Sequence, residues 1–565
     1  MSQSNTQFDA VVIGSGITGG WAAKELTEKG LKVLMLDRGR MVEHGKDYTG
    51  EHMPPWEIPF RGKPLRDLYN EEYEVQSTLY AFDETTRHYF NNDKQNPYRY
   101  EPGGFRWYRG DVVGGKSLLW GRQVYRWSDL DFAANKNDGH GIDWPIRYRD
   151  IAPWYSYVEK FIGVSGQQEN LPQLPDSEFL PPMGMSVVEQ HVKEGIEKHY
   201  RDRMMTIGRV AVLTRPHNGR GPCHYCGPCQ RGCSVGAYFS TQSSTLPAAR
   251  KTGNLTLKSD CVVEGIDYDP KTKRASGVRV INTGTGDKTT YNGKLVFLCA
   301  STIGSTQVLL NSTSESFPNG LANSSGVLGH YLMDHTLGTG AVGMVPGFDD
   351  KVIYGNRPNG IYIPRFRNLK GRDDDADFSR GYGYQGGAFR LGWDSMASKI
   401  PGFGADYKQA LRKPGPWMMY IVGFGECLPY KDNRMVLDHS NRDRFGIPQV
   451  KFHFDWGQNE QSMRKDIAVQ AQAMLEKAGA VNVNSFIAPS VGGEAIHEMG
   501  TARMGDNPGE SVLNQWNQAH DVPNLFVTDG ACMTSTSCVN PSLTYMALTA
   551  RAVDYAVKQL QQGKL

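Results

Sequence analysis

The sequence lacks the features that mark membrane proteins and nucleic-acid-binding proteins. No apolar run reaches about 18 residues, and the longest candidate, Pro416–Leu428, is short and carries Glu426, which excludes a spanning helix. Lys and Arg number 62 against 60 Asp and Glu, so the formal net charge is only +2 and the basic excess of nucleic-acid binders is missing. Charged residues make up 22% and aromatic residues 11%, a composition that excludes global disorder.

Signals for export and for a disulfide framework are also missing. The segment Met1–Phe8 is polar and has neither the basic start nor the apolar stretch of a cleavable signal, which indicates a cytoplasmic protein unless a partner carries it out. The nine Cys are an odd number, and four of them fall between Cys223 and Cys233, which is not a disulfide pattern. The length of 565 residues predicts one large composite domain or two to four domains.

What the sequence does have is glycine, 64 residues in all, and the first glycines form a clear pattern. The apolar run Phe8–Ile13 predicts a buried strand, which leads directly into a G-x-G-x-x-G turn at residues 14–19. A helix is expected over Trp21–Lys29, and a second strand over Leu31–Leu36 ends at Asp37. A strand, glycine turn, helix and strand ending in an acid together predict a Rossmann-type dinucleotide-binding unit.

Each residue of this fingerprint has a physical role. Gly14 allows the sharp turn, Gly16 lets a pyrophosphate approach the backbone, and Gly19 lets the helix and strand pack closely. The helix N-terminus offers free N–H groups and the positive end of its dipole to phosphate. Asp37 can accept hydrogen bonds from the hydroxyls of the adenosine ribose. Because FAD and NAD bind to the same unit, the fingerprint does not choose between them.

A second glycine-rich turn and a further strand–helix unit follow in the middle of the chain. The turn DVVGGKSLLWG contains Gly114 and Gly115, and paired glycines permit backbone conformations closed to other residues. It is either a connecting loop or a loop packed against a flat cofactor. A buried strand is expected at Lys294–Ala300 and a helix at Thr306–Leu310, at the carboxyl edge of a sheet where open α/β folds bind ligands.

Four cysteines, Cys223, Cys226, Cys229 and Cys233, have the spacing C-x2-C-x2-C-x3-C. This is close to the bacterial ferredoxin run that holds an iron–sulfur cluster, although Ser234 stands where that run has Pro and no second Cys set follows. A single zinc ion usually takes two separated Cys pairs and fits less well. The spacing therefore indicates either a [3Fe–4S] or [4Fe–4S] centre or a tight loop of reduced Cys with at most one local disulfide.

The C-terminal region holds the candidate catalytic residues. His497 opens the block HEMGTARMG, the strand-like Asn524–Asp529 follows, and an Asn-Pro pair at 540–541 precedes an amphipathic helix over Leu543–Leu560. A neutral imidazole beside a bound cofactor is a natural general base for an alcohol. No second His lies four residues after His497, so HExxH zinc chemistry is absent.

Together these blocks resemble the glucose–methanol–choline (GMC) oxidoreductase family. The similar segments are VVIGSGITGG with LMLDRG, VVGGKSLLWG, VFLCASTIGSTQVLL, HEMGTARMG and NLFVTDGA with CVNPSLTYMAL, which extend from residue 8 to about 555. The resemblance implies FAD as the nucleotide. It also implies an α/β fold with a discontinuous Rossmann-like FAD-binding domain plus an α+β substrate domain, whose antiparallel sheet lies over the flavin.

The resemblance also suggests domain boundaries. The FAD-binding domain is expected at 1–40, 100–150, 205–345 and 490–565, and the substrate-binding domain at 151–204 and 346–489. The segment 41–99 is expected to be a lid or a docking excursion. The residues that the resemblance implies for cofactor binding are Gly14, Gly16, Gly19, Asp37, Arg38, Gly114, Gly115, Ser117, Asp529, Gly530, Asn540 and Pro541.

The family's catalytic pair is matched by position. His497 corresponds to the active-site His, and Asn540 to a second position that is His or Asn in relatives. The implied reaction is alcohol oxidation, in which His497 accepts the hydroxyl proton while hydride leaves the same carbon for flavin N5, and Asn540 orients the alcohol oxygen. Some relatives attach FAD through a His in the Gly114–Gly115 loop, but Leu118-Leu119-Trp120 stands there, so non-covalent FAD is expected.

Within the family, the Cys-rich loop, the segment Trp120–Trp127 and the closing TSCVNPSLTYMAL are most similar to sugar dehydrogenase flavin subunits, especially glucoside 3-dehydrogenases. That similarity implies oxidation of a secondary hydroxyl of a sugar or glycoside, at C3 of glucosides. It further implies a small subunit with the export signal, a periplasmic site, and electrons relayed through the Cys cluster to a cytochrome c. The alternatives are an O₂-reducing sugar oxidase of the pyranose oxidase type, an enzyme for other alcohols such as sterols, and an FAD-binding scaffold that docks a partner.

Overall fold

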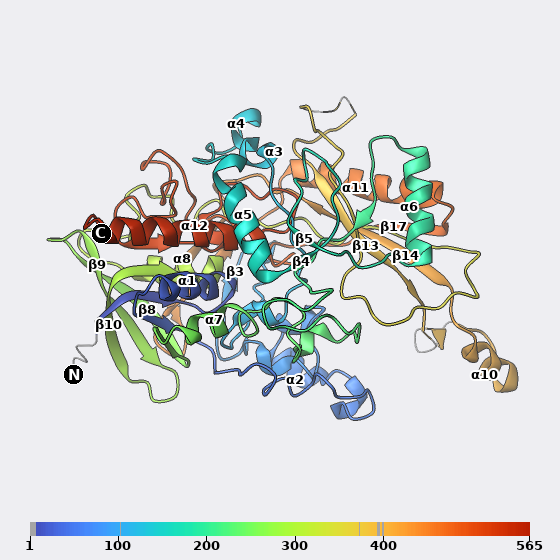
Figure 1. Ribbon diagram of the computed structural model, residues 1–565, viewed down its shortest axis with the longest axis horizontal. Coiled ribbons are helices and arrows are strands. Elements are labelled where there is room, and N and C mark those ends of the chain that lie inside the picture. The colour runs from blue at the N-terminus through green and yellow to red at the C-terminus, as the bar shows by residue number, and fades with distance from the viewer. Residues whose placement is uncertain (1–6, 102, 372, 374, 393–395, 398–399) are drawn as a thin grey trace.

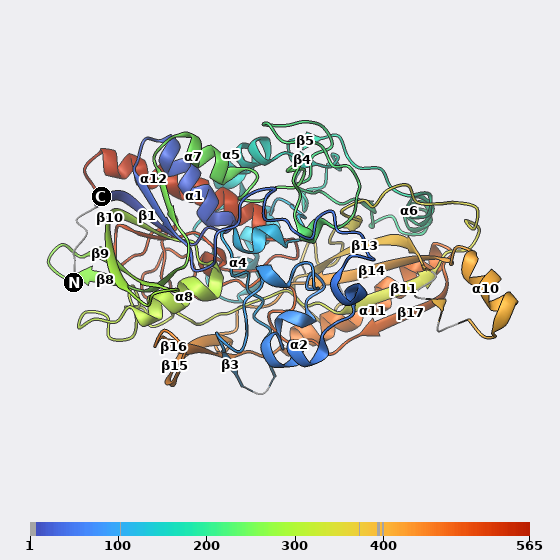
Figure 2. The ribbon, with the colours of Figure 1, turned by 90° about the horizontal axis from the view of Figure 1, so that it is seen from below.

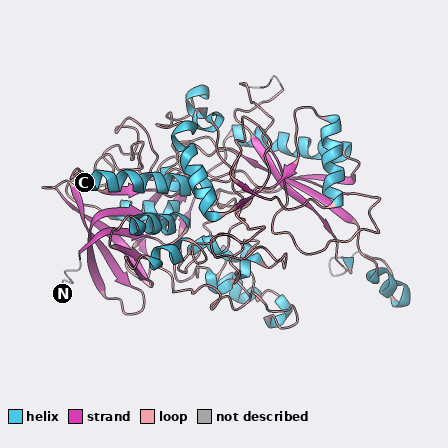
Figure 3. Ribbon diagram, viewed as in Figure 1, coloured by secondary structure: helices cyan, strands magenta, loops and turns pink. Residues whose placement is uncertain are grey.

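The computed structural model describes residues 7–101, 103–371, 373, 375–392, 396–397 and 400–565, so most of the polar start at 1–8 lies outside the described residues. Two sheets lie toward opposite ends of an elongated molecule, with helices and long loops between and around them (Figures 1 and 3). Among the described residues, no helix combines the length and the apolar character needed to cross a bilayer.

The N-terminal fingerprint forms the centre of the first, seven-stranded sheet. Strand β1 (Gln7–Ile13) lies between β2 (Val33–Leu36) and β10 (Lys288–Leu298), and β7 (Leu255–Lys258) extends the parallel part beyond β2. Helix α1 (Ile17–Glu28) connects β1 to β2, as a Rossmann-type unit requires. All four residues of β2 are buried, as expected for a parallel strand covered on both faces.

Strand β10 joins the parallel and antiparallel parts of this sheet. Its first half pairs antiparallel with β9 (Arg274–Asn282), which pairs in turn with β8 (Cys261–Asp269), and its second half pairs parallel with β1 and with β18 (Leu525–Val527). The predicted helices after β10 and at the chain end are present as α8 (Ser301–Asn311) and α12 (Ser542–Gln561). β10 thereby brings the C-terminal strand beside the N-terminal one.

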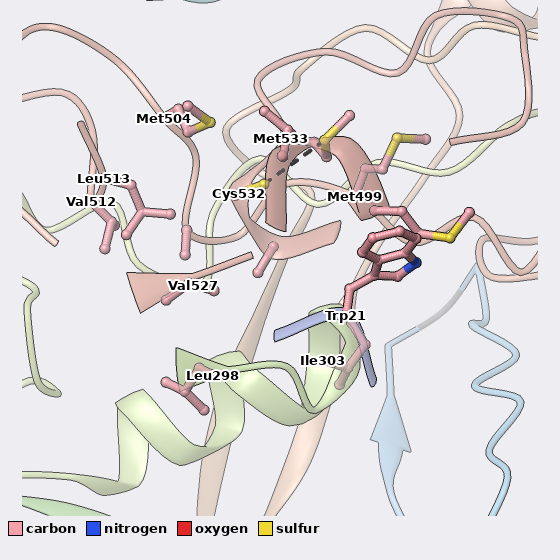
Figure 4. Close-up of a cluster of buried hydrophobic side chains, with 14 of the residues drawn as sticks. Trp21, Leu298, Ile303, Met499, Met504, Val512, Leu513, Val527, Cys532 and Met533 are labelled. Carbon is pink, nitrogen blue, oxygen red and sulfur yellow. Dashed lines mark hydrogen bonds between the residues drawn. The ribbon is translucent and has the colours of Figure 1, made fainter. Parts of the chain in front are cut away.

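A buried core anchors the loop that carries His497 to the first sheet. Met499, two residues after His497, is fully buried with Trp21, Leu298 and Val527, which come from α1, β10 and β18 (Figure 4). Burying one such large apolar side chain contributes about 1.5–3 kcal/mol. The loop is therefore held by the part of the protein that also forms the glycine fingerprint.

The second sheet has six strands, and every neighbouring pair in it is antiparallel. Helices α6 (Val187–His199) and α11 (Gln458–Lys477) pack against it and complete a second core. The strands in spatial order are β17 (Val481–Ile487), β11 (Thr339–Met344), β14 (Trp417–Gly425), β13 (Tyr382–Arg390), β12 (Ile361–Ile363) and β6 (Thr206–Ile207).

Four parts of the chain lie with a different sheet or core from the one that the expected domain division gives them. Strands β6 and β11 belong to the second sheet, although 205–345 is expected in the FAD-binding domain. Helix α5 (Tyr148–Ile162) packs against α12 in the first core, although 151–204 is expected in the substrate domain. Strands β15 (Arg434–Arg442) and β16 (Pro448–His453) pair with β3 (Arg99–Tyr100) near α8 (Figure 2). A short strand pairs with whichever sheet has an unpaired edge strand nearby, and no local sequence pattern identifies that sheet.

The segment 41–99 forms a small core of its own on the Gly114–Gly115 loop. Its buried residues include Tyr89 and Phe90, which pack with Leu118 and Leu119 from that loop. The segment carries α2 (Arg66–Glu72), visible below the body in Figure 1. The remaining short elements are α3 (Asp129–Phe132), α4 (Ala134–Asp138), α7 (Thr245–Lys251), α10 (Gly404–Arg412), β4 (Val164–Ser165) and β5 (Phe179–Leu180).

Candidate active site

A cavity of 1410 Å³ lies between the two sheets. Residues at the carboxyl ends of β1 and β2 line it on one side, and residues of β13 and β14 line it on the other. Small-molecule sites are usually about 300–1,000 Å³, so this cavity has room for a dinucleotide and a further small molecule.

The three glycines of the fingerprint differ in what surrounds them. A Cβ on Gly14 would lie 2.4 Å from the carbonyl oxygen of Cys299, and one on Gly19 would lie 1.9 Å from the carbonyl oxygen of Gly14. A Cβ on Gly16 would meet no protein atom within 4 Å. Gly14 and Gly16 line the cavity at the N-terminus of α1, whereas Gly19 is buried in the helix packing. The open side of Gly16 is thus a place that a pyrophosphate can fill.

Asp37 and Arg38 line the cavity at the end of β2. Asp37 accepts hydrogen bonds from the backbone N–H of Ser15, at 2.9 Å, and from its hydroxyl. Burial raises the pKa of Asp37 to about 6. Arg38 donates to the side chain of Asn96 and lies 3.8 Å from a carboxylate oxygen of Asp111. Asp37 therefore lies in the cavity wall where it can bind ribose hydroxyls, whereas Arg38 forms its contacts with the neighbouring loop residues Asn96 and Asp111.

The Gly114–Gly115 turn lies over the fingerprint. Both glycines have left-handed backbone conformations, with φ of 97° and 49°. The Ser117 hydroxyl donates to the carbonyl of Gly114 at 2.6 Å and lies 2.7 Å from the hydroxyl of Thr241, so it holds the turn together. Gly115 and Ser117 line the cavity, whereas Gly114 donates its N–H to the hydroxyl of Ser15 at 2.7 Å.

The C-terminal cofactor residues line the cavity beside α8. The carboxylate of Asp529 accepts from the Ser305 hydroxyl at 2.5 Å, and burial raises the pKa of Asp529 to about 6. A Cβ on Gly530 would lie 2.3 Å from the hydroxyl of Thr302, so only glycine fits there. Pro541 does not line the cavity but precedes the first residue of α12, whose N-terminus faces it through Ser542.

The two predicted catalytic residues face each other in the cavity wall. The side-chain nitrogen of Asn540 lies 3.2 Å from Nε2 of His497. Burial, aided by the positive charge of Lys116, holds the pKa of His497 well below its usual range. The imidazole is therefore neutral at physiological pH, which is the form that accepts a proton.

The structure adds residues to this site that no sequence motif identifies. Nδ1 of His335 lies 2.9 Å from Nδ1 of His497. The carboxyl oxygens of Asp334 accept the backbone N–H groups of Ala495 and His497, each at 3.1 Å, and burial and Glu498 raise the pKa of Asp334 to about 8. The adjacent pair 334–335 thus holds both the backbone and the ring of His497. Their only sequence signal is an Asp-His pair before a strand, which carries no recognised chemistry.

A chain of side-chain amides continues from Asn540 across the cavity. Gln385 on β13 donates to the amide oxygen of Asn540 at 2.7 Å. Gln123 donates to the amide oxygen of Gln385 at 2.7 Å, and the Tyr125 hydroxyl donates to Gln123 at 2.6 Å. Gln123, Gln385 and Asn540 all line the cavity. The second sheet therefore takes part in orienting the catalytic pair.

The four cysteines lie in a loop beside the cavity. Two residues of this loop, Tyr225 and Gln230, line the cavity. Across the described ranges, no group of three or more His, Cys, Asp or Glu side chains is arranged to hold a metal ion, and all four Cys are free thiols. Cys223 and Cys233 pack against a small apolar cluster, and their sulfurs accept backbone N–H groups at 3.4 and 3.3 Å.

Burial also disfavours the thiolate form that metal binding needs. It raises the pKa of Cys223 to about 11 and raises those of Cys229 and Cys233 as well. In this structure the predicted metal ligands Cys223, Cys226, Cys229 and Cys233 are not grouped around a common centre, and packing and hydrogen bonds within the loop place the sulfurs of Cys223 and Cys233.

The excursion 41–99 covers this loop and the cofactor side of the cavity. Glu51 accepts the backbone N–H of Ser234 at 2.7 Å, and the Tyr89 hydroxyl donates to the carbonyl of Arg231 at 3.2 Å. Leu79 and Tyr80 line the cavity. The excursion thus lies between the Cys loop and the Gly114–Gly115 turn.

Comparison with known proteins identifies the family. GMC oxidoreductase models match residues 8–337 and 429–549. The chain belongs to the GMC oxidoreductase family. Among its relatives, 2-methyl-1,2-propanediol dehydrogenase of Mycolicibacterium austroafricanum is 30% identical, over 98% of this chain and 96% of the relative. The fructose dehydrogenase large subunit of Gluconobacter japonicus is 26% identical over the full length of both. The crystal structure of pyridoxine 4-oxidase from Mesorbium loti shares the fold, with a TM-score of 0.61 and 14% identity over 97% of this chain and 99% of that one.

Proteins of this family bind FAD, and the residues present fit that cofactor. The open space at Gly16, at the N-terminus of α1, suits a pyrophosphate, and the N-terminus of α12 suits an electron-rich ring. Both groups favour the positive end of a helix dipole. Asp37 suits the ribose hydroxyls, and the left-handed turn at Gly115 forms a side-chain-free wall. These features make the cavity the candidate cofactor site, and its wall includes the His497–Asn540 pair.

Proposed function

We propose that this GMC oxidoreductase is an FAD-dependent dehydrogenase that oxidises a hydroxyl of a sugar or glycoside, with the secondary hydroxyl at C3 of a glucoside as the specific target. The observation that carries the proposal is the buried, neutral imidazole of His497 beside the amide of Asn540 in the cavity wall. Such a pair can receive the proton and bind the oxygen of an alcohol.

The residues of the site supply the proton chemistry. When bound, FAD supplies a two-electron acceptor for the hydride from the carbinol carbon. An alcohol oxygen between the two side chains donates its O–H to Nε2 of His497 and accepts an N–H from Asn540. The O–H bond breaks with its proton on His497, and the oxygen forms the carbonyl double bond as the carbon loses hydride. Lys116, paired with Glu498 at 3.1 Å, keeps the imidazole neutral before the alcohol arrives.

A sugar-sized substrate fits the outer part of the cavity. This part is lined by amide side chains, Gln123 and Gln385, and by partly exposed rings, Phe389 and Tyr420, which are 37% and 40% exposed. Amides bond hydroxyl groups, and aromatic faces cover the apolar faces of sugar rings. The relative named as a fructose dehydrogenase large subunit supports the same class of substrate.

A second candidate is a small aliphatic diol. The relative with 30% identity is named as a dehydrogenase of 2-methyl-1,2-propanediol, a molecule much smaller than a glycoside. The two candidates differ in how much of the cavity the substrate fills. A glycoside should gain specificity from the outer part, whereas a diol should contact only the catalytic pair and its immediate neighbours.

We further propose that electrons leave to an external protein acceptor such as a cytochrome c, and that the chain works in the periplasm with a small partner subunit that carries the export signal. The relative that is named as a large subunit supports an assembly of this kind. No electron step is assigned to an iron–sulfur cluster, because the thiols between Cys223 and Cys233 are not gathered around a common centre.

Turnover of methyl glucosides, lactose, gluconate and 2-methyl-1,2-propanediol with an artificial electron acceptor tests the proposal, followed by identification of the keto product. We expect the highest kcat/KM with a glucoside and a 3-keto product, and dye reduction to exceed peroxide formation in air. His497→Ala should lower kcat/KM by roughly 10²- to 10⁴-fold with FAD retained. His439→Ala, at an exposed position on β15, is the matched control. Full turnover by the His497 variant would refute the proposal.

A further inference from the structure

His335 is buried and its ring has a defined set of partners. It is 1% exposed, and its Nε2 lies 2.9 Å from the carbonyl oxygen of Ser537 and 3.3 Å from that of Thr536. Carbonyl oxygens only accept hydrogen bonds, so Nε2 must carry the hydrogen. Burial lowers the pKa of His335 to about 4, so the ring is neutral at working pH and its Nδ1 holds a lone pair.

This arrangement determines the protonation of His497. Nδ1 of His335 faces Nδ1 of His497 at 2.9 Å, and a hydrogen bond between them needs one donor. Since His335 can only accept there, His497 carries its hydrogen on Nδ1. A neutral His497 then has its lone pair on Nε2, the atom that faces Asn540 and the cavity.

The amide chain on the other side leads to the same assignment independently. The hydroxyl of Tyr125 donates to Gln123, Gln123 to Gln385, and Gln385 to the oxygen of Asn540. Asn540 is left with its nitrogen, a donor, toward Nε2 of His497, so Nε2 must accept. Each link along the six side chains pairs one donor with one acceptor, and the chain ends on the backbone carbonyl of Ser537.

We propose that His335 is a positioning residue that holds His497 in the tautomer with its hydrogen on Nδ1, so that the lone pair on Nε2 points at the substrate hydroxyl. His335 then accepts a charge-assisted hydrogen bond from the imidazolium that forms when His497 takes the proton. This inference rests on the proposed role of His497 as the base. It assigns to His335 the part that an orienting third group has in other base-catalysed enzymes.

The test compares His335→Phe, which fills the volume without an acceptor, with His335→Asn, whose amide oxygen can replace Nδ1. In His335→Phe we expect kcat and the rate of flavin reduction to fall by roughly a hundredfold or more, with KM changed little. In His335→Asn most of that loss should be recovered. His330→Asn is the matched control, because this ring is outside the site and bonds the carbonyl of Lys431 at 2.9 Å.

The pH profile separates positioning from a merely structural role. The titratable groups near His497 are His335, Lys116, Asp334, Glu498 and, beyond Glu498, Tyr545. Of these only His335 bonds the ring itself, so its loss should destabilise the imidazolium. The acidic limb of kcat/KM should then move to lower pH in His335→Phe and return in His335→Asn.

The outcomes distinguish this inference from the proposed function. If His497→Ala is inactive while His335→Phe keeps wild-type kcat and pH profile, the positioning role of His335 is refuted, and the proposal that His497 is the base stands. If His497→Ala itself keeps full turnover, the proposed function fails first. If His335→Phe no longer binds FAD or no longer shows a cooperative thermal transition, the inference is tested with His335→Asn alone. A kcat close to that of wild type and an unchanged acidic limb of kcat/KM in His335→Asn would support the inference. A hundredfold loss of kcat in His335→Asn would overturn it.

Discussion

The side-chain oxygen of Asn540 accepts a hydrogen bond from the amide of Gln385 at 2.7 Å, which leaves the nitrogen of Asn540 facing His497. A residue of the second sheet thus sets the orientation of an amide that belongs to the C-terminal segment. Because this contact joins the second sheet to the segment just before α12, the orientation of Asn540 toward His497 depends on how those two parts pack.

Changing Gln385 should therefore impair catalysis without touching either catalytic residue. In Gln385→Glu the carboxylate repels the oxygen of Asn540, so the amide turns and presents its oxygen to Nε2 of His497. We expect kcat to fall by roughly 10²-fold, and by about tenfold in Gln385→Met, which only removes the donor. Stopped-flow flavin reduction measures both. Gln190→Glu, on the exposed face of α6, is the control, and equal rates in the two Gln385 variants would contradict the amide-turning argument.

The pH dependence of activity follows from the lowered pKa of His497. A base works only when unprotonated, and burial holds this pKa well below its ordinary value of 6.5. The acidic limb of kcat/KM should therefore lie well below pH 6.5, with no loss as pH falls from 8 to 6.5. Lys116→Gln removes a positive charge that also lowers this pKa, so its limb should move to higher pH. Steady-state values of kcat/KM, measured with an electron acceptor whose own reduction does not depend on pH, test both statements. An acidic limb of the wild-type profile at or above pH 6.5 would contradict the statement about the lowered pKa of His497.

Sequence reasoning proposed the candidate site residues that lie in contiguous blocks, and several of them line one cavity in the structure. Gly14, Gly16 and Asp37 are recognisable because a strand, a turn and a helix follow each other within one unit. His497 and Asn540 were matched by the resemblance of their blocks, and the structure brings them within hydrogen-bonding distance.

The parts that sequence reasoning missed depend on long-range contacts. His335 reaches His497 across 162 positions, and Gln385 reaches Asn540 across 155, so no local spacing records either pair. The domain division stays a prediction, and short strands are the hardest part to assign, since β6 has only two residues and joins the second sheet through β12. The Cys loop is the opposite case. Its sequence has a regular local spacing, but the surrounding packing sets the positions of the sulfurs.

The Cys loop should behave as free thiols. With Cys223, Cys226, Cys229 and Cys233 unpaired and not grouped around a metal, we expect substoichiometric iron in anaerobically purified protein. Cys226 is the exposed member and should react first with a thiol reagent, ahead of the partly buried Cys229. Iron and acid-labile sulfide assays together with timed thiol modification measure this. Iron and sulfide at roughly three or four per chain would instead support the cluster that the spacing predicts.

Two fingerprint glycines should separate cofactor binding from folding. A methyl group on Gly16 meets no protein atom within 4 Å, so Gly16→Ala should fold normally while the methyl occupies space needed by the pyrophosphate. A methyl group on Gly19 would lie 1.9 Å from the carbonyl of Gly14, so Gly19→Ala should be destabilised by roughly 1–3 kcal/mol or more. Gly184→Ala, whose Cβ also meets nothing within 4 Å, is the control for a methyl group added to the cavity wall outside the fingerprint.

The measurements for this pair are the thermal transition and the flavin content after acid precipitation. Wild-type protein should release its FAD into the supernatant, because Leu119 stands in the loop where some relatives have a His that binds the cofactor covalently. Gly16→Ala should carry less flavin at an apoprotein transition temperature close to that of wild type, whereas Gly19→Ala should lose several degrees. A Gly16→Ala protein with full flavin content would show that the open space at this glycine is not where the pyrophosphate lies.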